Sequence, residues 1–216
     1  IGLQRMPAQL LGAGRLSKAI VREASSAEAR PFISKWHYSG NVPTGRNIFF
    51  AMEHGQPADL FSHEIYAMAA YGPSASHDLH GSMARTTGLP ITFDNILELR
   101  RLCRSEPRSS VPLTWFLARC HRILKAKGYR YIVSFSDPMH GHNGGIYRAA
   151  NFAHLGKTAS ATHNIDKDGN IVHRRVPYHH KRAKGYPKGV GMEMARKDLG
   201  LTKYTTPPKD RWFLEL

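Results

Sequence analysis

The chain has 216 residues and a formal net charge of +15, because 31 lysines and arginines stand against 16 aspartates and glutamates. This length suits one domain with extensions, and a hydrophobic content of 41% indicates a globular protein rather than a disordered one. No apolar run is long enough to span a membrane, and the first residues lack a signal-peptide layout, so we expect a cytoplasmic protein without a membrane partner. Two cysteines are too few for a disulfide framework. So large a basic excess favours a polyanion, and nucleic acid is the expected partner.

The N-terminal part of the chain is predicted to be an arm followed by a helix and two strands. Residues 1–28 are interpreted as the arm, and residues 29–216 as a single domain. A helix is expected over 26–36 with Ser26 as its N-cap. Strands are predicted over 48–53 and 64–72 from their apolar content.

The middle of the chain combines an irregular segment with the strongest helix pattern. Residues 72–95 are rich in Gly, Ser, His and Pro, so they are expected to be irregular. Residues 96–103 follow as a strand, and its alternation predicts one face made of Leu97, Leu99, Arg101 and Cys103. Residues 109–128 repeat apolar side chains at i, i+3 and i+4, and Gly128 ends that helix.

The C-terminal half alternates strands and helices. A strand over 129–137 ends at Pro138, and residues 144–156 are predicted to form a short helix. Residues 163–175 indicate a hairpin that turns at Asp168-Gly169, and 211–216 a last edge strand. This order favours an α/β (α+β) fold, with a mixed, mostly antiparallel sheet flanked by helices. By topology-level analogy it is the order of a GNAT-like, acetyltransferase-type domain.

A basic segment over residues 172–188 is the best candidate for contact with DNA. No acidic residue lies between Asp168 and Glu193, and Tyr178 and Tyr186 are interleaved with the basic side chains. Basic groups neutralise phosphates, and tyrosine rings can stack on bases. The alternative is a solvated basic loop. The candidate DNA-binding residues are Arg174, Arg175, Lys181, Arg182 and Lys184.

Two stretches hold most of the candidate catalytic residues. Asp137 ends a predicted strand, where ligands of open sheets bind, and Tyr147 follows on the next helix. The alternative is a structural turn with a capping Asp. His37 and Tyr38 are adjacent at a predicted helix end. If they meet Asp137 in space, the three residues form either an acid/base set or a nitrogen and oxygen ligand set for a metal such as iron.

The strand over residues 96–103 adds charged candidates. Glu98 and Arg100 are expected side by side on one strand face, as a base held in place or as a strand ion pair. The basic and hydroxyl side chains that precede the long helix are suited to bind an anion. A glycine-rich turn for a coenzyme pyrophosphate is missing there, where the sequence has "RSEPRSSVP". The candidate cofactor-binding residues are Arg100, Arg101, Arg104, Ser109 and Ser110.

Several separate motifs together resemble one known family. They are "FISKWHYSGNVPTGRNIFF", "LELRRLCRSEP", "PLTWFLARCHRILKAKGY", "IVSFSDP", "GGIYRAANFAHLGKT", "HRRVPY" and "PKDRWFLEL". The chain from about residue 29 to its end resembles the Mom family of phage DNA-modification proteins. The resemblance implies a GNAT-like fold and conversion of adenine in double-stranded DNA to N6-carbamoylmethyladenine, which protects the DNA from host restriction.

The resemblance also implies a set of site residues. The family's functional positions fall on His37, Tyr38, Asp137 and Tyr147, with an iron (Fe2+) site among the first three and an acetyl-CoA-like donor. Two alternatives stay open. One is a conventional acetyl-CoA-dependent N-acetyltransferase acting on a small molecule or protein, and the other is a non-catalytic DNA-binding protein.

Overall fold

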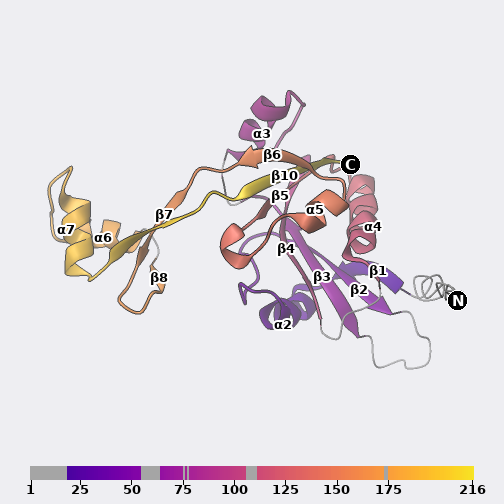
Figure 1. Cartoon of the computed structure of the whole chain (residues 1–216), viewed down its shortest axis with the longest axis horizontal. Helices are drawn as coiled ribbons and strands as arrows, with labels where there is room; N and C mark the ends of the chain where they lie inside the picture. The colour runs from indigo at the N-terminus through magenta and orange to yellow at the C-terminus, as the bar shows by residue number, and fades with distance from the viewer. Residues whose placement is uncertain (1–18, 55–63, 75, 77, 106–110, 173–174) are drawn as a thin grey trace, which may run out of the picture. The chain divides into compact units, whose positions relative to one another are not determined.

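A computed structural model describes residues 19–54, 64–74, 76, 78–105, 111–172 and 175–216. These residues form two compact units (Figure 1). The first comprises the described residues up to Phe135 together with Gly144–Leu155 and Trp212–Leu216, and the second comprises Ser136–Asn143 and Gly156–Arg211. Residues 1–18 of the predicted arm lie outside the described residues. Within the described ranges, no helix is both long and apolar enough to cross a membrane.

A seven-stranded sheet forms the centre of the first unit. Its order is β1 (Ala19–Ala24), β2 (Ile48–His54), β3 (Ile65–Gly72), β4 (Ile96–Arg104), β5 (Tyr131–Ser136), β10 (Asp210–Glu215) and β6 (Ala153–Lys157). The first four strands pair antiparallel, whereas β4 and β5 pair in parallel. The mixed, mostly antiparallel sheet flanked by helices that the sequence predicts is therefore observed.

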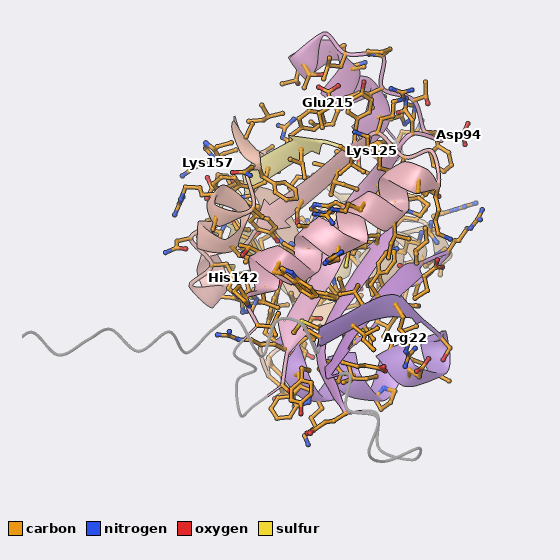
Figure 2. The ribbon with its side chains drawn as sticks, turned by 90° about the vertical axis from the view of Figure 1, so that its right-hand side faces the viewer. Arg22, Asp94, Lys125, His142, Lys157 and Glu215 are labelled. Atoms are coloured by element: carbon orange, nitrogen blue, oxygen red, sulfur yellow. The ribbon has the colours of Figure 1, made fainter. Side chains whose placement is uncertain are left out.

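Helices cover both faces of this sheet because neighbouring strand residues point to opposite sides. Phe50 packs in one core cluster with Phe116 and Leu117 of α4 (Leu113–Ala126). Phe49 packs in another with Ile33 of α2 (Ser26–Trp36). Figure 2 shows α4 lying across its face of the sheet, with Lys125 near the end of the helix. The predicted stripe of α4 is confirmed, since Phe116, Leu117, Cys120 and Leu124 are buried.

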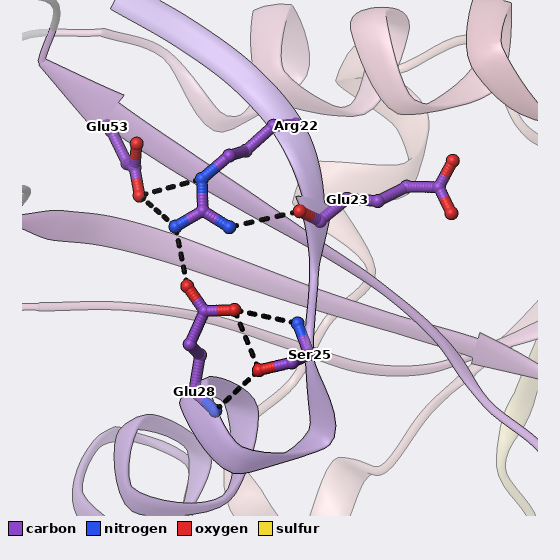
Figure 3. Close-up of polar contacts among 5 residues, drawn as sticks. All are labelled: Arg22, Glu23, Ser25, Glu28 and Glu53. Atoms are coloured by element: carbon purple, nitrogen blue, oxygen red, sulfur yellow. Dashed lines mark hydrogen bonds and ion pairs between the residues drawn. The ribbon is translucent and has the colours of Figure 1, made fainter.

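A charged cluster joins β1 to the start of α2 (Figure 3). Ser25 is the N-cap, not Ser26 as predicted, because its side chain accepts the Glu28 N–H while Glu28 accepts the Ser25 N–H at 2.8 Å. Arg22 bonds both Glu28, at 2.6 Å, and the buried carboxylate of Glu53. Hydrogen bonds from Arg22 and Ser25 lower the pKa of Glu28 to about 2. The strand that the sequence assigned to an arm is thus tied into the sheet.

Three predicted elements are wrong. Residues 72–95 include helix α3 (Leu79–Thr87), which buries Leu79 and Met83 one turn apart and ends at Gly88 with φ 71°. The helix predicted over 144–156 stops early, as α5 (Gly145–Ala149), because Asn151 adopts φ 63° and the chain continues as strand β6. The last strand, β10, lies between β5 and β6 rather than at an edge. Its buried Trp212 and Phe213 suit such an interior place.

The second unit contains a three-stranded sheet and two short helices. The strands are β7 (Ala161–Ile165), β8 (Ile171–Val172) and β9 (Thr202–Thr206), in the order β8-β7-β9. The predicted hairpin is confirmed, since Asp166 accepts the N–H groups of Asp168 and Asn170 at the turn. Helices α6 (Arg175–Ala183) and α7 (Gly191–Asp198) are joined by Asp198, which bonds His180 at 3.2 Å and Tyr186.

Candidate active site

A β-bulge in β4 re-aims the side chains at the middle of the sheet. The pairing with β3 shifts register between Ala70 and Tyr71, whose partners are Arg101 and Leu99, so Arg100 is the extra residue. Leu99 packs in the cluster with α4, whereas Cys103 packs in the cluster with α2. The prediction that Leu97, Leu99, Arg101 and Cys103 share one face is therefore wrong. Strict alternation cannot anticipate an inserted residue.

The parallel ladder between β4 and β5 ends just before this bulge. Its last pair is Glu98 with Val133, although β4 continues to Arg104. Beyond that pair, the buried Ser134 hydroxyl lies 2.9 Å from the Leu99 carbonyl and 2.8 Å from the Tyr147 hydroxyl. A serine has only one proton, so donation to Leu99 and donation to Tyr147 are alternatives. The Tyr147 hydroxyl is thus held at the split between the two strands.

Aromatic rings hold Tyr147 in place. Its ring stacks on Trp212 with centroids 5.7 Å apart and meets Phe152 edge-on at 5.5 Å. Gly144 permits this packing, because its φ is 73° and a Cβ built there would overlap the Trp212 ring. Burial raises the pKa of Tyr147, and the nearby Tyr38 and Glu98 raise it further against the opposing hydrogen bond from Ser134. Tyr147 is therefore a neutral phenol near pH 7.

Tyr38, just after the end of α2, and Glu98, in β4, both lie within electrostatic range of Tyr147. Both also act electrostatically on Arg101, whose pKa burial lowers. We call the five residues Tyr38, Glu98, Arg101, Ser134 and Tyr147 the β4 cluster. The structure thus brings three predicted catalytic residues together, and His37 adjoins them because its ring lies 4.4 Å from that of Tyr38.

Two arginines of β4 hold the loop that follows Tyr38. Arg101 donates to the backbone and side-chain oxygens of Asn41 at 3.1 and 3.0 Å. Arg100 donates to the Thr44 carbonyl at 3.0 Å and to the Asn47 side chain at 3.1 Å. These bonds make both arginines positioning residues for the loop. Their role in cofactor binding stays a prediction.

His37 does not fit the predicted iron site as it is arranged here. The Ser39 N–H donates to His37 Nδ1 at 3.1 Å, so the neutral imidazole carries its proton on Nε2 and has no lone pair left for a metal. Within the described ranges, no group of three or more His, Cys, Asp or Glu side chains is arranged to hold a metal ion.

Asp137, the third predicted iron ligand, belongs to the second unit. Its carboxylate pairs with Lys209 at 2.8 Å and accepts the Met139 N–H at 3.1 Å. Burial raises the pKa of Asp137, but the Lys209 and Met139 bonds outweigh burial and leave the pKa below its usual value. Asp137 is therefore an ionised, paired carboxylate that orders the turn η1 (Pro138–His140).

The remaining predicted residues are spread along the chain. Arg104 ends β4, whereas Ser109, Ser110 and Arg174 lie outside the described residues. Arg175, Lys181 and Arg182 lie in α6, and Lys184 follows it. Sequence reasoning missed Ser134 and Trp212, although a serine inside the apolar run "YIVSFS" is a signal for a buried hydroxyl that needs a partner.

The parallel ladder between β4 and β5 ends early, and the buried Tyr147 is held at that split by Ser134. Residues 18–203 match the Mom protein family. The chain therefore belongs to the Mom protein family, and it is a phage-type DNA-modification protein.

Solved structures similar to this chain include three acetyltransferases. An N-acetyltransferase from Staphylococcus aureus Mu50 is 14% identical with a TM-score of 0.46, covering 91% of this chain and 98% of that one. A GCN5-related N-acetyltransferase from Kribbella flavida is 9% identical with a TM-score of 0.49, covering 93% and 99%. A ribosomal-protein-alanine N-acetyltransferase from Brucella melitensis is 12% identical with a TM-score of 0.45, covering 91% and 99%. No curated protein matches this sequence.

Proposed function

We propose that this protein converts adenine in double-stranded DNA to N6-carbamoylmethyladenine in the host cytoplasm and so protects phage DNA from restriction. The observation that carries the proposal is the family match over residues 18–203. The sequence resemblance attaches this reaction to the family, and the positions it implicates include Tyr38 and Tyr147. Both belong to the β4 cluster, which supports their role in the reaction.

The proposed reaction requires a base and a second group that stays protonated. The lone pair of the adenine amino group is delocalised into the ring, so nitrogen becomes a useful nucleophile only as its proton leaves. The Glu98 carboxylate is the acceptor for that proton, and the neutral Tyr147 phenol donates a hydrogen bond beside it. The new bond joins N6 to an sp³ carbon, while the bond from that carbon to the donor's leaving group breaks and the leaving group departs with its electron pair. An activated donor, acetyl-CoA-like or another, therefore supplies a carbamoylmethyl group rather than an acyl group.

DNA contact is proposed for the basic segment of the second unit. Arg175, Arg182 and Lys184 are exposed on or directly after α6, and Tyr178 is 47% exposed. Exposed arginine and lysine side chains neutralise phosphates without selecting a sequence. Because the amino group lies inside the base stack, the target base must leave the helix before it reacts.

Mass spectrometry of nucleosides from the DNA of cells that express the protein tests this function. We expect modified adenine with the natural protein and a loss of at least about tenfold with Tyr147→Phe, since the hydrogen-bond donor is removed. Tyr129→Phe is the matched control and should keep the product. Acetylated small molecules or proteins with normal adenine would instead establish an N-acetyltransferase. Normal adenine with intact DNA binding would establish a non-catalytic DNA-binding protein.

A further inference from the structure

A pocket lies between helix α3 and the beginning of β4 in the first unit. It encloses about 470 Å³, its open mouth included. Its walls come from separate parts of the chain that share the core cluster of Leu79, Met83 and Ile96. Its lining includes Leu79, His80, Phe93, Ile96 and Glu98. Apolar walls with a few polar groups are typical of small-ligand sites.

Phe93 gives this pocket an exposed aromatic ring. The side chain is 60% exposed although it lines the pocket, and His80 meets its ring edge-on with centroids 6.2 Å apart. A T-shaped neighbour does not stack parallel on the Phe93 ring, and with 60% of the residue exposed much of the ring stays accessible. Phe93 therefore offers a face on which a planar ring system can stack.

Glu98 lines this pocket and also belongs to the β4 cluster. It is the one carboxylate among the described lining residues. A carboxylate only accepts hydrogen bonds, so it selects a ligand with an N–H group and repels a carbonyl oxygen at the same position. The same carboxylate is close enough to Tyr147 to raise the pKa of that phenol. A ligand bound at Glu98 thus lies within electrostatic range of Tyr147.

We propose that this pocket binds the extruded adenine base, stacked on Phe93 with its exocyclic amino group at Glu98. The inference rests on the proposed function and names the subsite at which the substrate is recognised. Adenine carries an N6 amino donor, whereas hypoxanthine and thymine carry carbonyl oxygens at the corresponding place. Enzymes that act on a base read its Watson–Crick edge and hold it between aromatic or apolar side chains. Phe93, Leu79 and Ile96 supply those side chains, and Glu98 reads the edge.

Ligand-detected NMR with the full chain tests the pocket, with adenosine and inosine as the two probes. We expect adenosine to bind at least about tenfold more tightly than inosine, because only adenosine carries an amino donor at position 6, where inosine places a carbonyl oxygen against the Glu98 carboxylate. Phe93→Ser should weaken adenosine binding by about tenfold, while Phe93→Trp should retain it. Ile20→Ser, which also changes a half-exposed apolar side chain but outside this pocket, should bind like the natural protein.

Glu98→Gln separates recognition from a folding defect. A glutamine can present either its carbonyl or its amide group, so adenosine and inosine should bind that variant with equal affinity. A merely misfolded variant would lose both ligands together. Equal binding of the two nucleosides by the natural protein, or unchanged binding by Phe93→Ser, would overturn the proposal.

The NMR test needs neither a group donor nor a reaction, so it can fail independently of the proposed function. If DNA from expressing cells carries modified adenine while Phe93→Ser binds adenosine normally, the pocket is wrong and the function stands. If adenosine selectivity depends on Phe93 and Glu98 but adenine stays unmodified, the function is wrong and the pocket stands.

Discussion

The β4 cluster and the basic segment on α6 place polar groups in opposite environments. Ser134 is completely buried and Tyr147 is held by aromatic rings, so the two hydroxyls depend on each other and on the Leu99 carbonyl for hydrogen bonds. In α6, the side chains of Arg175 and Arg182 are exposed, and Pro177 is the buried member of the helix. A buried polar group acts through local hydrogen bonds and pKa shifts, whereas an exposed charge acts mainly at longer range and is screened by salt. The effects of substitutions in the two regions should therefore differ in the property that changes as well as in the size of the change.

Gly144→Ala should lower the free energy of unfolding most, because it disrupts the packing of the Trp212 ring against Tyr147. The new Cβ would overlap the Trp212 ring in a backbone with φ 73°. Overpacking and the positive φ together should cost about 2–4 kcal/mol of unfolding free energy in a urea titration. Gly128→Ala is the control, since its φ is 95° but nothing lies within 4 Å of the added atom. Equal losses in the two variants would show that Trp212 adapts to the extra atom.

His121 should make the first unit sensitive to mild acid. Burial lowers the pKa of His121 to about 4 from 6.5, and its Nε2 has no hydrogen-bond partner among the described residues. In the unfolded chain His121 takes up a proton below pH 6.5, while in the folded chain it stays neutral. The free energy of unfolding therefore falls between pH 6.5 and about 4, by up to about 3 kcal/mol.

Urea titrations at pH 7 and pH 5 measure the effect of His121. His121→Leu should remove part of the difference between the two pH values and should cost little at pH 7, since the orphaned nitrogen disappears with the ring. An identical pH dependence in the variant and the natural protein would contradict a buried neutral imidazole.

Ser134→Ala should have a smaller effect on stability and a larger effect on activity. The substitution removes the hydroxyl that serves both Leu99 and Tyr147, at a cost of about 1–2 kcal/mol. It also removes the hydrogen bond that lowers the pKa of Tyr147, so that pKa should rise further. Ultraviolet titration of tyrosinate and the level of modified adenine give the two readouts. Ser134→Cys keeps a weak hydrogen-bond donor at this position. If it restores neither the pKa of Tyr147 nor the level of modified adenine, the hydroxyl is not the relevant group.

Arg182→Ala should leave stability within about 0.5 kcal/mol, because the side chain is exposed. The slope of the logarithm of DNA affinity against the logarithm of salt concentration should fall by about 0.9 for the lost phosphate contact. Arg130→Ala removes the same charge from an exposed position in the first unit and should leave the slope unchanged. Equal slopes for all three proteins would remove Arg182 from the DNA interface.

Periodic patterns predicted the elements that repeat over several turns or strand residues. Helix α4, the strands β2 to β5 and the hairpin at Asp168 follow directly from such patterns. Helix α3 was missed because its Gly, Ser and His content hides the single apolar pair Leu79–Met83. The end of α5 was missed because an asparagine with positive φ, here Asn151, looks like any other helix residue in sequence.

The sequence by itself determined the fold class, the basic segment and the family, because these depend on composition, periodicity and motifs along the chain. Only the tertiary structure decided which candidates meet. The bulge at Arg100 reverses the faces of β4, and the early end of the β4–β5 ladder brings Tyr147 to Ser134. Asp137, predicted as a site residue together with Tyr147, forms an ion pair with Lys209 within the second unit. Contacts of this kind join residues far apart in the chain, so no local pattern contains them.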